Sequence, residues 1–168
     1  MITLVLGGNK SGKSDFALDL LQKNEKPALF IATGKARDLE FRRQIQDHRI
    51  SRGPEIEVME VSADLPQTLR KAKADFPSVL VDSLDYWLFS IRKSGCENER
   101  IQELSEVLNH WTATNLILVS CEAGLGPLPL SGEVRAFIRG LGALNQACAQ
   151  IADRVFLVAA GLPLQLKA

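Results

Sequence analysis

The stretch GGNKSGKS, residues 7–14, follows the apolar run ITLVL, residues 2–6, and precedes an amphipathic segment. It satisfies the pattern G-x-x-x-x-G-K-[S/T] with Gly7, Gly12, Lys13 and Ser14. The glycines let backbone N–H groups close on phosphate oxygens, and the following helix presents its positive end to an anion. The strand, loop and helix context therefore predicts a phosphate-binding loop and a P-loop NTPase-like α/β fold.

Short apolar runs alternate with longer amphipathic segments along the rest of the chain. This alternation is typical of parallel strands joined by crossover helices. We expect a single nucleotide-binding transferase domain over residues 1–168, with a mostly parallel sheet flanked by helices. The expected strands are residues 2–6, 28–32, 56–61, 79–82, 116–120 and 155–158, with a short edge strand near 164–167. The expected helices are residues 14–22, 37–49, 99–110 and 133–151.

Composition narrows the choice of partners and compartment. The 168 residues include 20 basic and 20 acidic side chains, so no global positive field favours nucleic acid. The three cysteines are far apart and in no CxxC spacing, which argues against a disulfide framework or a zinc site and fits a reducing cytoplasm. The first apolar run ends at glycines before it could complete a signal peptide or membrane span. We therefore expect a cytoplasmic protein without stable membrane insertion.

The phosphate-binding loop suggests roles for three side chains. Lys13 would neutralise charge on the β- and γ-phosphates, and Ser14 would be a ligand of Mg²⁺. A second metal ligand is expected at the end of a neighbouring apolar strand, where the run VLVDS supplies Asp82. Hydroxyl, carboxylate and phosphate oxygens are hard ligands that suit Mg²⁺. Together these residues indicate phosphoryl or nucleotidyl transfer from a nucleoside triphosphate.

One of the two histidines has unusual neighbours. The polar segment LEFRRQIQDHRISR places His48 among Arg42, Arg43, Arg49 and Arg52. Nearby positive charge both binds phosphate and favours the neutral imidazole, which is the nucleophilic form. His48 is therefore a candidate nucleophile toward an α-phosphate. His110 has no such neighbours and is expected to be structural.

These motifs together resemble those of a known enzyme family. The resemblance spans nearly the whole chain and rests on LVLGGNKSGKS, FIAT at residues 30–33, IQDHR around His48, VLVDSLDYWL from Val79, EAGLG from Glu122, LGALNQ from Leu141 and the ending ADRVFLVAAG. The chain is similar to the bifunctional adenosylcobinamide kinase/adenosylcobinamide-phosphate guanylyltransferase family of cobalamin biosynthesis. Asp85 stands where this family commonly has a hydroxyl residue, and Cys121 where it favours asparagine.

The resemblance implies a two-stage transferase that acts on a corrinoid and uses GTP, with ATP as the other candidate phosphoryl donor. It would phosphorylate adenosylcobinamide and then attach GMP to that phosphate through a guanylylated histidine, with His48 and Lys13 as the catalytic residues. It also implies a homo-oligomer, a trimer with sites shared between subunits. The nucleotide-contacting positions that it implies are Gly7, Gly8, Asn9, Lys10, Ser11, Gly12, Lys13, Ser14, Thr33, Gly34, Lys35, Arg49, Ile50, Ser51, Arg52, Glu60 and Asp82, with Ser14 and Asp82 also holding the metal.

Two other functions stay open from the sequence alone. The chain could be a different small-molecule P-loop kinase, with His48 an ordinary helix residue, or a nucleotide-binding regulatory module without efficient transfer chemistry. The Gly/Pro-rich stretch at residues 122–132 is a candidate wall of the site or a plain surface connection. Large side chains at Tyr86, Trp87 and Phe89 are expected in the core rather than at an interface.

Overall fold

A computed structural model describes residues 1–33, 55–112 and 114–168 of the chain. The expected helix at residues 37–49, which includes His48, lies outside the described residues. The described elements, in chain order, are β1 (Ile2–Gly7), α1 (Lys13–Lys23), β2 (Ala28–Ala32), β3 (Ile56–Glu60), α3 (Leu65–Asp75), β4 (Ser78–Asp82), α4 (Leu84–Lys93), α5 (Glu97–Asn109), β5 (Asn115–Cys121), α6 (Gly132–Ile151), β6 (Arg154–Ala159) and β7 (Leu162–Lys167).

The seven strands form one sheet in the order β3-β2-β4-β5-β1-β6-β7. Six of them are parallel, and only β7 runs antiparallel to its neighbour β6. The expected mostly parallel sheet is therefore confirmed, and every expected strand forms within two residues of its expected bounds. The expected edge strand at the end of the chain is β7.

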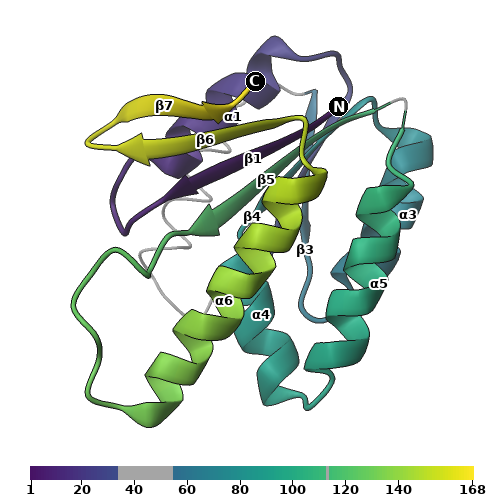
Figure 1. Cartoon of the computed structure of the whole chain (residues 1–168). Coiled ribbons are helices and arrows are strands. Elements are labelled where there is room, and N and C mark those ends of the chain that lie inside the picture. Colours follow the sequence, from purple (N-terminus) through teal and green to yellow (C-terminus); the bar gives the residue numbers. More distant parts are fainter. Residues whose placement is uncertain (34–54, 113) are drawn as a thin grey trace.

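Helices cover both faces of the sheet, and the strand sequences explain why (Figure 1). Because successive side chains of a strand point to opposite faces, β1 sends Leu4 and Leu6 to one face and Val5 to the other. The first face packs against α3, α4, α5 and α6, and the second packs against α1. Both faces of the central strands are buried, as their continuous apolar runs require.

Two helices, α3 and α4, were not among those expected from the sequence. In α4 the buried residues Leu84, Trp87, Leu88 and Ile91 follow the spacing of one helical face. In α3 the buried Leu65, Leu69 and Ala72 do the same, and a proline in the first turn fits the start of a helix. No helix within the described ranges is long and apolar enough to cross a membrane.

The aromatic cluster of α4 is divided between core and surface. Trp87 is fully buried, as expected, and its indole N–H donates to the carbonyl of Ala63 at 3.2 Å. The expectation that Tyr86 and Phe89 lie in the core was wrong, because they are 48% and 60% exposed. They lie on the part of the helix that turns away from the sheet, since the sheet is already covered by the Leu84–Trp87–Leu88–Ile91 face.

Candidate functional site

The loop between β1 and α1 forms the centre of the candidate site. It leaves the carboxyl end of β1 at Gly7 and enters α1 at Lys13, so the amino end of that helix points at the loop. Within the loop, the Ser11 N–H donates to the Gly8 carbonyl at 3.3 Å, and the Gly12 carbonyl accepts the first helical bond from Phe16 at 3.0 Å. This is the strand, loop and helix arrangement that the sequence predicts for phosphate binding.

Glycine is required at two positions of this loop. A Cβ at Gly7 would clash with Ser11 Oγ and would lie 2.8 Å from the carbonyl oxygen of Val158. Gly12 has φ of 89°, which side-chain-bearing residues rarely adopt, and a Cβ there would lie 3.1 Å from Gly161 Cα. The loop is thus packed directly against the β6–β7 hairpin.

The hairpin also holds the loop by a hydrogen bond. The N–H of Gly161, in the β6–β7 turn, donates to the Ser11 carbonyl at 2.8 Å. This support was missed from the sequence, although the short ending AAGL between two apolar runs marks a turn. The C-terminal hairpin therefore fixes the backbone on which phosphate binding depends.

Lys13 and Ser14 open the first turn of α1, and both are partly buried. Lys13 Nζ donates to the Gly8 carbonyl at 3.3 Å, so its ammonium group lies over the loop and not in bulk water. That position places a positive charge beside the backbone N–H groups of the loop. It is the charge expected to face the β- and γ-phosphates of a nucleotide.

Asp82 was expected at the end of a strand next to β1, and this expectation was wrong, because its strand β4 is not paired with β1. β5 lies between them, with Gly7 paired to Cys121 on one side and Val119 paired to Asp82 on the other. Sheet order depends on contacts between distant segments, which a local apolar run does not encode. Asp82 nevertheless ends its strand at the same edge as Gly7, and it is partly buried there.

Thr33 and Glu60 also lie at the carboxyl edge of the sheet. The Thr33 side chain is fully buried, accepting from the Ser83 N–H at 2.8 Å and donating to the Ser83 carbonyl. These bonds join the end of β2 to the start of α4. Glu60 ends the edge strand β3 opposite Ala32 and is exposed. Nucleotide contact by either residue stays a prediction.

The remaining expected site residues lie outside the described part of the chain. They are Gly34, Lys35, His48, Arg49, Ile50, Ser51 and Arg52. The structure therefore brings together the phosphate-binding loop, Thr33, Glu60 and Asp82 at one edge of the sheet. The histidine and the arginines beside it remain sequence-based predictions.

A side chain of α6 holds the end of β5 by two hydrogen bonds. Asn145 accepts from Ser120 Oγ at 2.6 Å and donates to the Cys121 carbonyl at 3.0 Å. The sequence contains this asparagine in the LGALNQ motif, but nothing local to it indicates a partner 25 residues away. These two hydrogen bonds fix the end of β5, which is paired with the start of the phosphate-binding loop.

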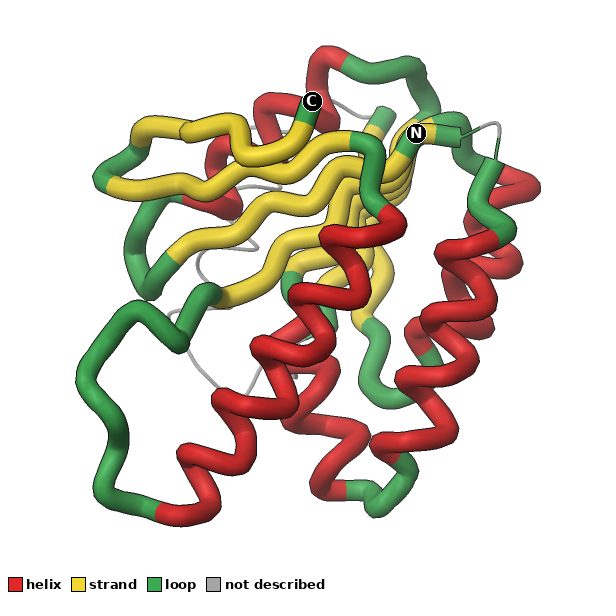
Figure 2. Tube along the Cα trace, in the orientation of Figure 1, coloured by secondary structure: helices red, strands yellow, loops and turns green. Residues whose placement is uncertain are grey.

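The Gly/Pro-rich stretch after β5 is anchored at both ends and open between them (Figure 2). Glu122 Oε1 accepts from the Gly124 N–H at 2.8 Å, and Arg135 Nη1 donates to the carbonyls of Pro129 and Leu130 at 2.8 and 2.7 Å. Between these anchors the leucine side chains are exposed, and Leu130 reaches 99%. The stretch is a surface loop that begins at the site.

The pKa of the Cys121 thiol is affected by three charged residues near the site. Burial raises the pKa of the Cys121 thiol, the negative charges of Asp85 and Glu122 raise it further, and the positive charge of Lys13 lowers it. All three cysteines are free thiols. The Cys121 thiol therefore stays protonated near neutral pH, and the charges of an acid of α4 and of the lysine of the phosphate-binding loop both act on it.

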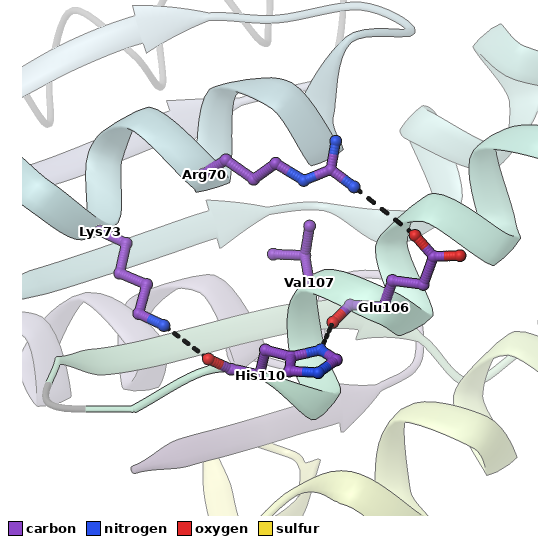
Figure 3. A pocket seen from close by; sticks show the side chains of 5 residues that line it. All are labelled: Arg70, Lys73, Glu106, Val107 and His110. Atoms are coloured by element: carbon purple, nitrogen blue, oxygen red, sulfur yellow. Dashed lines mark hydrogen bonds and ion pairs between the residues drawn. The ribbon is translucent and has the colours of Figure 1, made fainter.

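A separate hollow of about 340 Å³ lies between α3 and α5, near their carboxyl ends (Figure 3). The basic side chains that line it bind other residues of the same hollow. Lys73 Nζ donates to the His110 carbonyl at 2.5 Å, and Arg70 Nη2 lies 3.7 Å from Glu106 Oε2. The His110 ring contacts the Glu106 carbonyl through Nδ1 at 2.8 Å. His110 thus directly follows α5, at the edge opposite the phosphate-binding loop, and its ring contacts the last turn of that helix, which agrees with its expected structural role.

Comparison with solved structures supports the fold class. The flagellar accessory protein FlaH from Methanocaldococcus jannaschii superposes with a TM-score of 0.58 at 12% identity, covering 99% of this chain and 77% of FlaH. An ATPase of a bacterial type III secretion system superposes with a TM-score of 0.62 at 11% identity, covering 98% of this chain and 56% of the ATPase. The fold and loop define the P-loop NTPase class.

Comparison of sequences identifies the family within that class. Residues 3–166 match the family model described as cobinamide kinase / cobinamide phosphate guanyltransferase. The bifunctional adenosylcobalamin biosynthesis protein CobP of Pseudomonas aeruginosa is 35% identical over 174 residues, covering 99% of this chain and 98% of CobP. CobU of Salmonella typhimurium is 27% identical over 184 residues, covering 99% of this chain and all of CobU. The chain belongs to the cobinamide kinase / cobinamide phosphate guanyltransferase family.

Proposed function

We propose that this chain phosphorylates adenosylcobinamide and then transfers GMP from GTP to the resulting phosphate. The observation that carries the proposal is the phosphate-binding loop, built at the carboxyl edge of a mostly parallel sheet in a chain whose residues 3–166 match the family model. This edge is where ligands bind in open α/β sheets. The substrates are a nucleoside triphosphate and a corrinoid.

In the phosphorylation step, the loop and Lys13 bind the β- and γ-phosphates. The backbone N–H groups of residues 8–14 orient these phosphates, and the Lys13 ammonium neutralises the charge that develops on them. Ser14 and Asp82 supply a hydroxyl and a carboxylate at the same edge, which suits Mg²⁺. When bound, Mg²⁺ would neutralise phosphate charge. Among residues 1–33, 55–112 and 114–168, no group of three or more His, Cys, Asp or Glu side chains is arranged to hold a metal ion.

In the guanylyl transfer step, His48 acts as the nucleophile. Its neutral imidazole nitrogen bonds to the α-phosphorus of GTP, and pyrophosphate leaves with the electrons of the broken P–O bond. The phosphate of the corrinoid then attacks the phosphoramidate, and the imidazole leaves. Arg49 and Arg52 would hold the phosphates, and the carboxylate of Glu60 could pair with the ring N–H and amine of guanine. Adenine offers no such pair of donors.

Turnover with both acceptors tests the proposal. We expect the purified chain to phosphorylate adenosylcobinamide with ATP or GTP. We expect it to release pyrophosphate from GTP beyond one equivalent per enzyme only when adenosylcobinamide phosphate is present as acceptor. Chromatography and mass spectrometry of the corrinoids follow both products. Phosphorylation without any guanylyl transfer would instead indicate a plain P-loop kinase. Nucleotide binding without turnover would indicate a regulatory module.

We further propose that the chain forms a homo-oligomer. The edge strand β7 exposes Leu162, Leu164 and Leu166 on one of its faces, and an open strand edge with exposed apolar side chains is a typical interaction surface. Light scattering coupled to size exclusion should give a mass that is a multiple of 18.5 kDa, three times that value for the trimer implied by resemblance. A monomer at all concentrations would contradict this proposal.

A further inference from the structure

Asp85 occupies the same sheet edge as the phosphate-binding loop. It lies in the first turn of α4, three residues after Asp82 ends β4. The neighbouring strand β5 ends at Cys121, which is paired with Gly7 at the start of the loop. Because β4, β5 and β1 are consecutive in the sheet, the start of α4 and the phosphate-binding loop lie on either side of the end of β5.

A role at the start of a helix does not explain why one oxygen of Asp85 is buried. Asp85 Oδ1 is buried and has no hydrogen-bond partner in the described structure. Acids in the first turn of a helix favour its positive end, but they can do so with the carboxylate in water, as the exposed Glu133 does in α6. Buried carboxylate oxygens normally accept hydrogen bonds. This oxygen therefore lacks the hydrogen bond that a buried carboxylate normally has, and a donor brought by a ligand would supply it.

The charge of Asp85 acts on the interior of the site. Burial is the largest cause of the raised pKa of the Cys121 thiol, and the negative charge of Asp85 is the next largest. The positive charge of Lys13 lowers the pKa of the same thiol. A group whose pKa responds to both charges lies in the electrostatic range of both. The charges of Asp85 and Lys13 thus both reach the end of β5, which lies between the strands that lead to them. Both residues lie at the carboxyl edge of the sheet, the edge at which open α/β sheets bind their ligands.

We propose that Asp85 Oδ1 accepts the hydroxyl proton of the phosphoryl acceptor, an inference that rests on the proposed kinase function. The acceptor's hydroxyl oxygen forms a bond to the γ-phosphorus as its proton passes to the Asp85 carboxylate. The bond from the γ-phosphorus to the β–γ bridging oxygen breaks, and the nucleoside diphosphate leaves with that electron pair. Asp85 then returns the proton to solvent. Guanylyl transfer to a phosphate acceptor, which has no hydroxyl proton to lose, does not need this residue.

The two half-reactions separate this role from a structural one. In Asp85→Asn, phosphorylation of adenosylcobinamide should fall at least about 100-fold in kcat, because the amide cannot take the proton. Guanylyl transfer to prepared adenosylcobinamide phosphate should stay within about threefold of the unsubstituted enzyme. The control Glu133→Gln removes a first-turn acid from α6 and should leave both rates unchanged. Thermal unfolding of each variant checks that the fold is kept.

A second readout tests the position of Asp85 independently of turnover. Alkylation of Cys121, followed at mildly alkaline pH by peptide mass spectrometry, should be severalfold faster in Asp85→Asn, since removing the negative charge lowers the thiol pKa. Phosphorylation retained within about threefold in Asp85→Asn would overturn the proposal, and so would an equal loss of both half-reactions. If the unsubstituted enzyme phosphorylates no corrinoid while it still transfers GMP, the kinase function itself fails.

Discussion

His48→Ala should abolish the covalent guanylyl-enzyme and lower guanylyl transfer to adenosylcobinamide phosphate by at least about 1,000-fold. The reason is that the imidazole nitrogen divides one difficult displacement into two easier ones. Without it, the phosphate of the corrinoid would have to attack the α-phosphorus directly, from a position that is arranged for attack on the phosphoramidate. The rate is measured as pyrophosphate release from GTP in the presence of the phosphorylated acceptor.

The chain offers a matched control for this substitution, because it contains only two histidines. His110→Ala removes the imidazole at the end of α5, which contacts the Glu106 carbonyl at the opposite edge of the sheet. It should leave guanylyl transfer unchanged. Phosphorylation of adenosylcobinamide should persist in His48→Ala, since that step does not use the histidine. A labelled protein in His48→Ala would show that another residue carries the GMP.

Lys13→Ala should reduce both half-reactions by about 100-fold to 1,000-fold in kcat. Lys13 Nζ lies over the phosphate-binding loop, 3.3 Å from the Gly8 carbonyl, where it can turn to a phosphate without leaving the site. Charge-assisted hydrogen bonds of this kind are about twice as strong as neutral ones. Because both transfers require the same triphosphate to be held, a single substitution is expected to impair both. Steady-state kinetics with each acceptor measures the loss.

The control for Lys13 is Lys23→Ala in the last turn of the same helix. Lys23 is exposed and sits at the opposite end of α1 from the loop. It should change neither rate, although it removes the same charge from the same helix. If Lys13→Ala retained both activities, the loop would not be the site of nucleotide binding in this chain. Equal losses in Lys13→Ala and Lys23→Ala would indicate a general effect of charge on α1.

Much of the fold could be predicted because its strands are buried on both faces and read as short apolar runs. β2 was predicted with its observed bounds, Ala28–Ala32. The helices α3 and α4 were missed even though their buried residues have helical spacing. In α4 the apolar surface also includes Tyr86 and Phe89, so the run does not alternate cleanly with polar residues. The order of strands in the sheet could not be predicted, because it depends on pairing between segments far apart in sequence.

The phosphate-binding loop could be predicted because its chemistry is local, with every required residue within eight consecutive positions. The groups that support it are distant in sequence. Gly161 holds the Ser11 carbonyl from the C-terminal hairpin, and Asn145 clasps the end of β5 from α6. Asp85 gave no sequence signal beyond its difference from the family pattern. Its significance comes from a buried oxygen, which only the three-dimensional arrangement reveals.

The most direct test of the central claim is to find where GMP attaches to the protein. The unsubstituted enzyme is incubated with GTP labelled at the α-phosphate, without a corrinoid, and the modified peptide is identified by mass spectrometry. We expect one guanylyl group on the peptide that contains His48, stable to alkali and lost in acid, as a phosphoramidate is. A modified peptide that does not contain His48, or no covalent label at all under conditions that support turnover, would contradict the account.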